Sequence, residues 1–314
     1  MPAFFNGAFG HKPSGGLVPG TGQHPVAAGV ALRYLSTGPI CRRPEDLALL
    51  TSIMLGPDGM DEGCEEFPNL QSLPERVKGV DISSLTVYWV DGIHCLGVSP
   101  LEKNMKVALD NVIGDLSGHC AKVCPLEDTG LMKHLAHATD IWACMLHQGN
   151  PNTFVSHMQN GQPFSAIWEL CKWAILGRSP FTLAALLLCV LEQAPTWTPK
   201  RTERFLKEGS QLQQEFEQLL GDNAVLLCPS HPKVAPRHAW PLTRPFNWIY
   251  TGIWNMMLAP ATQVPLGLSE VEQLPVGVQI IARRGNDHLT LAVANHLAAS
   301  FGGWVPPSAV QITA

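Results

Sequence analysis

The chain has 314 residues, of which 46% are hydrophobic and 15% are charged. That length is sufficient for a large buried core, in one large domain or two smaller ones. The net charge of −5 argues against a nucleic-acid-binding protein, because it supplies no basic surface for phosphate groups. The longest apolar run, at 181–191, is too short to span a bilayer.

Helices and strands can be predicted in chain order from the apolar periodicity. The first 40 residues are rich in glycine and proline and predict loops and turns. A short helix is expected at 44–56, and a polar surface connection follows at 57–80. The β-branched and aromatic residues at 85–91 predict a strand, and the apolar period at 99–118 predicts a helix.

The remainder of the chain alternates in the same way. We predict strands at 119–126, 224–230 and 274–282, and helices at 130–147, 198–222 and 286–304. Asp287 stands where it can cap the last helix. This alternation of strands and helices indicates the α/β class.

Cysteine and histidine positions give little sign of a metal site. Nine cysteines, odd in number and without a Cys-x-x-Cys pair, favour reduced thiols over a disulfide framework. Cys120 and Cys124 are the closest pair of cysteines, and a metal or redox role for them is the less favoured alternative. His134 and His137 share a helical spacing, but no further ligand completes a zinc set beside them in the sequence. We therefore expect no metal and no other cofactor.

The opening stretch carries the most specific motif. The run from Pro2 to Ser14, PAFFNGAFGHKPS, fits the pattern Pro-Ala followed by Gly-x-x-Gly-x-Lys-Pro-Ser, and STGPICRRPEDL at 36–47 continues it. These blocks resemble the amidase signature family of serine hydrolases, as do PATQVPLG at 260–267 and LPVGVQ at 274–279. The resemblance covers nearly the whole chain. It implies a mixed twisted sheet flanked by helices, with 1–314 as the C-terminal portion of a single amidase domain.

The resemblance also implies where the catalytic groups lie. Family members use a nucleophilic serine, a cis-linked second serine and a lysine, and the motif Gly-Gly-Ser-x-Arg would place the nucleophile three positions before Met1. We therefore expect no catalytic residue in this chain, an open N-terminal side of the sheet, and no amide hydrolysis by the chain alone. Lys12 matches a structural lysine of the family. Ser230 and His231 are adjacent, and neighbouring strand residues point to opposite faces. We therefore interpret them as a strand end that turns on prolines and not as a nucleophile–base pair.

Two further motif positions have structural interpretations. Gly7 and Gly10 are expected to permit close backbone packing. Arg42 and Asp46 are spaced for an ion pair or a helix cap.

An aromatic cluster in the C-terminal third is the candidate substrate-binding site. Its members are Phe246, Trp248, Tyr250 and Trp254. They can form the core face of a helix or the wall of an acyl channel, since a lipid chain needs an apolar slot. Within the family, the runs LLCPSHPKVAPRHAWPLTRPFN at 226–247 and NDHLTLAVANHLAASFGGW at 286–304 most resemble the fatty-acid amide hydrolases. This resemblance favours the channel and a fatty-acid amide substrate.

The segment 164–192 reads as two apolar helices that break at 177–180. It can belong to the core or form a membrane-facing cap. The residues that would contact the membrane are Trp168, Trp173, Phe181 and Leu187. The resemblance favours the cap, and with it an intracellular, membrane-associated protein that can form a homodimer.

Three functions agree with these observations. The first is a lipid-amide hydrolase, the second a non-catalytic relative that pairs or competes with such an enzyme. The third is another amidase activity, such as the amidotransferase component that supplies ammonia for glutamyl-tRNA. The apolar 164–192 segment favours the first.

Overall fold

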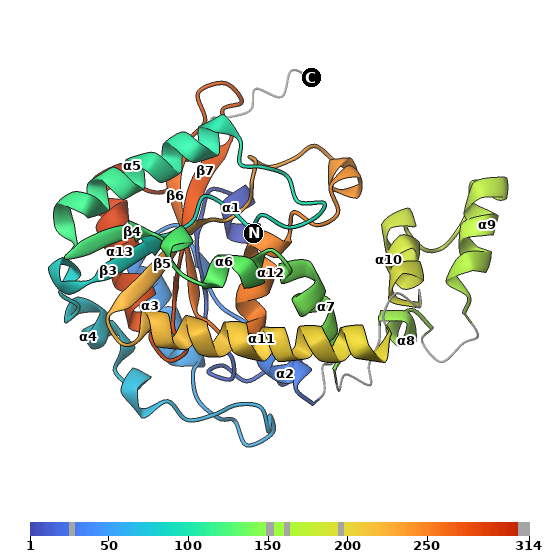
Figure 1. Cartoon of the computed structure of the whole chain (residues 1–314), viewed down its shortest axis with the longest axis horizontal. Coiled ribbons are helices and arrows are strands. Elements are labelled where there is room, and N and C mark those ends of the chain that lie inside the picture. Colours follow the sequence, from blue (N-terminus) through green and yellow to red (C-terminus); the bar gives the residue numbers. More distant parts are fainter. Residues whose placement is uncertain (25–28, 149–153, 160–163, 194–197, 307–314) are drawn as a thin grey trace.

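The computed structural model describes residues 1–24, 29–148, 154–159, 164–193 and 198–306. Within them, seven strands form one sheet in the order β2-β1-β6-β7-β5-β3-β4, with helices on both faces (Figure 1). The strands are β1 Phe9–Lys12, β2 Ile40–Cys41, β3 Thr86–Trp89, β4 Lys122–Pro125, β5 Ala224–Pro229, β6 Ala261–Leu268 and β7 Pro275–Ala282. The helices are α1 Pro2–Phe5, α2 Ala31–Tyr34, α3 Glu45–Met54, α4 Leu73–Lys78, α5 Lys103–His119, α6 Leu131–Leu135, α7 Ala138–His147, α8 Phe154–Gln159, α9 Ala166–Leu176, α10 Leu183–Gln193, α11 Pro199–Leu220, α12 Ile249–Met256 and α13 Asp287–Phe301.

The sheet is mixed, as the sequence predicts. Strand β3 pairs in parallel with both β4 and β5, whereas β5–β7, β6–β7, β1–β6 and β1–β2 are antiparallel. The central strand β5 is buried along its whole length. Burial on both faces explains its continuous apolar sequence AVLLCP. The expected α/β class is therefore confirmed.

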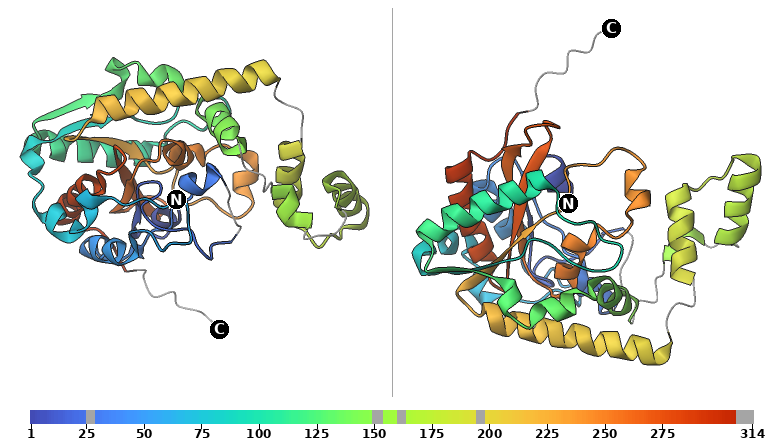
Figure 2. Two further views of the ribbon diagram at one scale, coloured as in Figure 1. Left: turned by 90° about the horizontal axis from the view of Figure 1, so that it is seen from below. Right: turned by 45° about the horizontal axis from the view of Figure 1, so that its top comes forward.

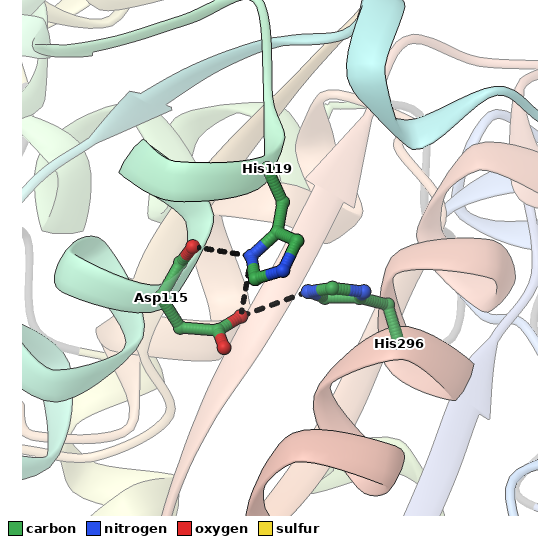
Figure 3. Close-up of side chains that lie close together, drawn as sticks. All are labelled: Asp115, His119 and His296. Atoms are coloured by element: carbon green, nitrogen blue, oxygen red, sulfur yellow. Dashed lines mark hydrogen bonds and ion pairs between the residues drawn. The ribbon is translucent and has the colours of Figure 1, made fainter.

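Alternation along β5 divides the core into two layers. Leu226 and Cys228 face the layer formed with α7, α11 and α12, whereas Val225 and Leu227 face the layer formed with α5 and α13. Figure 2 shows α11 along one side of the sheet and α13 on the other. Helices α5 and α13 lie side by side, and their facing polar side chains are drawn in Figure 3.

Helix α11 shows how local sequence sets the element boundaries. The Thr198 side chain accepts a hydrogen bond from the Arg201 amide, and Pro199 occupies the first turn. The helix ends at Gly221, whose positive φ of 51° an L side chain rarely adopts. Its apolar stripe is buried against α7 and α12, and it includes Phe205, Leu212 and Phe216.

Four sequence predictions need correction. The polar surface connection expected at 57–80 contains helix α4, which buries Leu73 and Val77. The first 40 residues are not all loop: they contain α1, β1 and α2, and β1 pairs between β2 and β6. The strand β6 at Ala261–Leu268 was not expected either. The helix expected at 130–147 is two helices, α6 and α7. The β1 strand escapes prediction because its four residues, FGHK, hold a glycine and a lysine and depend on pairing with a strand about 250 positions away.

Helices α8–α10 lie beyond the end of α11, away from the sheet (Figures 1 and 2). They enclose a small apolar cluster of Val155, Ala166 and Cys189. As expected, α9 and α10 are separate: Gly177, with φ of 62°, ends α9. Several large apolar side chains of this segment are exposed, namely Ile167, Trp168, Trp173, Ile175, Leu176 and Leu187. Among the described helices, every one is too short or too polar to cross a bilayer.

Candidate functional site

The motif block Pro2–Ser14 packs tightly around β1, between β2 and β6. A Cβ atom added at Gly10 would stand 2.6 Å from the Ala3 Cβ, so only glycine allows this approach. Gly7 has a φ of 61°, and an added Cβ would meet the Pro275 ring at 2.9 Å. The close packing expected of both glycines is confirmed.

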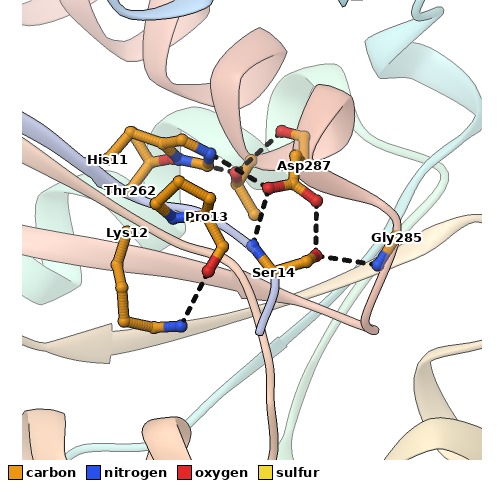
Figure 4. A network of polar contacts seen from close by, with 8 residues as sticks. His11, Lys12, Pro13, Ser14, Thr262, Gly285 and Asp287 are labelled. Carbon is orange, nitrogen blue, oxygen red and sulfur yellow. Dashed lines mark hydrogen bonds and ion pairs between the residues drawn. The ribbon is translucent and has the colours of Figure 1, made fainter. Parts of the chain in front are cut away.

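A buried carboxylate ties this block to the last helix (Figure 4). The Asp287 Oδ1 atom accepts a hydrogen bond from the Ser14 amide at 2.9 Å, and Oδ2 accepts from Ser14 Oγ at 2.5 Å. Ser14 Oγ in turn accepts from the Gly285 amide at 2.8 Å. The Asp287 carboxylate is fully buried and lies 3.2 Å from His11 Nε2. The contacts join two segments 273 residues apart in sequence.

His11 bridges two partners of this network. Thr262 Oγ1 donates to Thr290 Oγ1, which donates to the main-chain carbonyl of Asp287. His11 Nδ1 lies 2.8 Å from Thr262 Oγ1, and Nε2 lies 3.2 Å from Asp287 Oδ1. Because a carboxylate can only accept, Nε2 is the donor to Asp287. The His11 ring therefore ties β1 to both β6 and α13.

The carboxylate form of Asp287 agrees with its surroundings. Burial alone would raise the pKa of Asp287, because it disfavours the charged form. The hydrogen bonds and positive charge of His11, with the two hydrogen bonds from Ser14, outweigh this effect and lower the pKa below its ordinary value. We expected Asp287 to cap α13, but the N-cap position belongs to Asn286, and the Asp287 side chain bonds to Ser14 instead.

Lys12 lies beside this network. Its Nζ donates to the Pro13 carbonyl at 3.0 Å (Figure 4). Burial lowers the pKa of Lys12 to about 8, and the negative charge of Asp287 opposes that shift. The structural role that the resemblance implies for this lysine stays a prediction.

Met1, the first residue of the chain, is partly buried. Burial lowers the pKa of the Met1 amino group to about 6. The Phe5 ring packs edge-on against His231, with centroids 5.1 Å apart. Burial lowers the pKa of His231, and the Met1 ammonium adds to that effect. Ser230 Oγ donates to Gln263 Oε1, so Ser230 and His231 face different partners, as neighbouring strand residues should.

The aromatic cluster divides into two parts. Tyr250 and Trp254 are buried on the inner face of α12, where Trp254 packs 5.7 Å from the Phe216 ring. Burial raises the pKa of Tyr250. Trp248 is half-buried and stacks with Trp142 at 4.3 Å. The remaining member, Phe246, is 36% exposed. The sequence could not separate these roles, since the four residues are spaced only two or four apart.

The structure also brings together residues that sequence reasoning left unconnected. His134 and His137 have no acidic neighbour in the sequence that would complete a zinc set, but the fold brings them close to a glutamate. Glu208 of α11 lies 2.7 Å from His137 Nδ1 and 3.4 Å from His134 Nδ1.

Arg42 and Asp46, which were predicted to form an ion pair or a helix cap, make other contacts. The Arg42 guanidinium lies 4.9 Å from the centre of the Trp304 ring, while Asp46 occupies the first turn of α3.

Comparisons with known proteins agree with the motif block. The amidase family model matches residues 1–291. Fatty-acid amide hydrolase 2 from Homo sapiens is 39% identical over 98% of this chain and 56% of its own length. Fatty-acid amide hydrolase 2-A from Danio rerio is 40% identical over 99% of this chain and also 56% of its own length. The chain thus spans a little over half the length of these relatives.

Solved structures extend the likeness to the fold. A glutamyl-tRNA(Gln) amidotransferase protein from Thermotoga maritima superposes with a TM-score of 0.65 at 22% identity, covering 93% of this chain and 58% of its own. A bacterial aryl acylamidase gives a TM-score of 0.67 at 16% identity, over 95% of this chain and 59% of its own. With a family model that matches residues 1–291 and relatives near 40% identity, the chain belongs to the amidase signature family.

Proposed function

We propose that this chain forms part of an amidohydrolase that cleaves fatty-acid amides. The observation that carries the proposal is the 39% identity to fatty-acid amide hydrolase 2, which extends over nearly the whole chain. An apolar substrate also suits the exposed apolar surface of α9 and α10.

The proposed chemistry is acyl transfer through a serine. The serine oxygen adds to the amide carbonyl carbon, and its proton passes through a second serine to a neutral lysine. Backbone amides stabilise the oxyanion, the C–N bond breaks as the amine takes up the proton, and water then hydrolyses the acyl-enzyme. The sequence 1–314 lacks the Gly-Gly-Ser-x-Arg motif that holds the nucleophile. In this proposal the serine–serine–lysine set therefore lies outside these 314 residues.

The described residues would supply the supporting wall of such a site. The Asp287 network holds Ser14 and the end of β1 against α13. The same block begins at Met1, which lies among buried side chains near His231. A rigid anchor of this kind keeps catalytic groups on an adjoining segment within the small tolerances that catalysis requires.

We assign the aromatic cluster to the acyl-binding wall. In this assignment the accessible Phe246 and half-buried Trp248 contact the lipid chain, and the buried Tyr250 and Trp254 support them from behind. Phe246 is held by close contact with Gly97, where an added Cβ would stand 2.6 Å from its ring.

We assign α9 and α10 to contact with a lipid leaflet. Trp168 is 63% exposed and Trp173 is 42% exposed, and both lie on α9. Leu187 of α10 is 40% exposed, and Phe181, which packs on Phe164, lies between the two helices. Exposed apolar area of this kind is unfavourable in water and marks a surface for membrane or protein contact. A second copy of the chain is the alternative occupant.

Co-sedimentation with phosphatidylcholine vesicles tests the leaflet assignment. The double substitution Trp173→Glu and Leu187→Glu should release the protein from the vesicles. Trp240→Glu with Leu242→Glu is the matched control, because both side chains are 45% exposed on a different element. Equal release by both pairs, or by neither, contradicts the assignment. Loss of a dimer in sedimentation velocity, with unchanged vesicle binding, would favour the second copy.

A fluorophosphonate probe tests the catalytic proposal. The chain 1–314 should remain unlabelled, whereas a longer form that carries Gly-Gly-Ser-x-Arg before Met1 should be labelled and should hydrolyse a fatty-acid amide. A stoichiometric adduct on Ser230, Ser14 or any other serine of 1–314 would refute the assigned mechanism. A folded longer form that takes no label would indicate a non-catalytic relative.

A further inference from the structure

Three metal-ligating side chains converge where α5 meets α13 (Figure 3). Asp115 and His119 stand one turn apart on α5, and His296 reaches them from α13. Asp115 Oδ2 lies 2.8 Å from His296 Nε2 and 3.9 Å from His119 Nδ1. All three ligand atoms lie within 4.8 Å of one another, although 181 residues separate Asp115 from His296.

The apolar core holds these side chains in place. Leu116, next to Asp115, and Leu297, next to His296, are both fully buried in the same apolar cluster. The two helices therefore cannot separate without exposing that cluster to water. The imidazole rings of His119 and His296 lie 4.7 Å apart at an angle of 64°. Because the backbone of both helices is fixed in this way, side-chain rotation alone can adjust the distances between the three ligand atoms.

The separations suit a common ion of the zinc type. Zinc binds histidine nitrogen at about 2.0–2.1 Å and carboxylate oxygen at about 2.0–2.2 Å. In tetrahedral geometry these bond lengths place ligand atoms about 3.3–3.5 Å apart. The observed 2.8 Å and 3.9 Å lie on either side of that value. His119 Nδ1 lies 2.8 Å from the main-chain carbonyl of Asp115, and the side chain is 55% exposed. The ring can therefore leave that hydrogen bond and turn toward the ion without disturbing the core.

We propose that Asp115, His119 and His296 form a Zn²⁺ site that links α5 to α13. Two imidazoles and one carboxylate favour late first-row divalent ions, and the exposed side of the cluster leaves room for water as a fourth ligand. The ion's role here is structural, because it joins two helices that cover the same face of the sheet. It acts independently of the proposed amide hydrolysis and of the Asp287 network at the other end of α13.

Metal titration of the purified chain tests the site. After treatment with EDTA and dialysis, the protein should bind one Zn²⁺ per chain in calorimetry and show raised thermal stability. Co²⁺ should give visible d–d bands without a thiolate charge-transfer band, which excludes the nine cysteines as ligands. His119→Ala, His296→Gln and Asp115→Asn should each weaken Zn²⁺ binding at least about tenfold.

Two control variants separate this site from other histidine–carboxylate pairs. His94→Ala removes an exposed pair in which His94 Nε2 lies 2.8 Å from Asp91, without a second histidine. His137→Ala removes the histidine nearest Glu208. Both should bind Zn²⁺ as the parent chain does. The proposal fails if the parent chain binds no ion, if His119→Ala binds as tightly, or if His137→Ala loses the ion instead. Circular dichroism in EDTA verifies that each variant is folded, and the exposed His119 gives the least disruptive substitution.

Discussion

Replacing Asp287 with asparagine should strongly destabilise the protein, because no orientation of the amide satisfies the network. Oδ1 accepts two contacts, from the Ser14 amide and His11 Nε2, and Oδ2 accepts from Ser14 Oγ. If the new NH₂ group faces the amide and imidazole, it opposes two donors. If the NH₂ group faces Ser14 Oγ, which accepts from the Gly285 amide, the Ser14 hydroxyl proton loses its acceptor. In both cases buried His11 loses its carboxylate partner.

The expected loss follows from these unmatched buried groups. Removing one partner of a buried histidine–carboxylate pair costs about 3–5 kcal/mol. A domain is typically stable by only about 5–15 kcal/mol, so the substitution should remove at least about a fifth of that margin. The parent protein should also lose this stabilisation in acid. The pKa of Asp287 is lowered in the fold, so its contribution is complete above the unfolded-state pKa of about 3.9 and disappears as the pH falls below it.

Urea unfolding at pH 7 measures the effect. With an m-value of about 3 kcal/mol/M, the midpoint of Asp287→Asn should fall by about 1–2 M. Asp81→Asn is a matched control, since Asp81 accepts from the Ser83 amide at 3.0 Å and from Ser83 Oγ at 2.7 Å but is exposed. It should change stability by about 1 kcal/mol or less. Equal midpoint shifts for the two variants would refute the argument that burial of the pair determines the cost.

Three further results are expected from unfolding measurements. Burial and the Arg76 guanidinium lower the pKa of His288 to about 4, so stability should decline as the pH falls from about 6.5 to 4, and His288→Gln should flatten that decline. Gly209→Val should cost about 1–3 kcal/mol in urea unfolding, because an added Cβ would stand 2.6 Å from the Met145 sulfur. Lys12→Met should not reduce stability at pH 7. The parent protein should gain stability as the pH rises from about 8 to 10.4, and Lys12→Met should abolish that gain. A clear loss of stability at pH 7 would show that the amine is required.

Elements with a strong local period could be predicted from the sequence. Helices α5 and α11 and strands β5 and β7 fall within about two to four residues of their predicted ranges, because each buries one clear apolar face or a continuous apolar run. Strands β1 and β6 could not be predicted in this way. Strand β1 depends on long-range pairing, and β6 contains Pro265 and Gly267, which usually indicate a turn.

The side-chain sites were harder to predict than the elements. The motif block marked Ser14 as a family position, whereas His11 occupies an unspecified position of the pattern. Their partner Asp287 is 273 residues from Ser14, and the sequence indicated only that Asp287 could cap the last helix. Likewise, Asp115 and His119 show a helical spacing of four, whereas His296 joins them only through the packing of α5 on α13. Such groupings depend on tertiary contacts that a periodic pattern does not specify.

The protein departs from simple burial rules at two separate places. Around Asp287, a carboxylate and a histidine are buried between β1 and the start of α13, where removal from water is costly unless every donor and acceptor is matched. On α9, the opposite occurs, since two tryptophans remain exposed although burial would stabilise them. Departures of this kind concentrate where function constrains a sequence. The first lies in the motif block that adjoins Met1, and the second faces away from the sheet. The proposed enzyme therefore needs a rigid polar anchor for chemistry and a distinct apolar surface for collecting a lipid substrate.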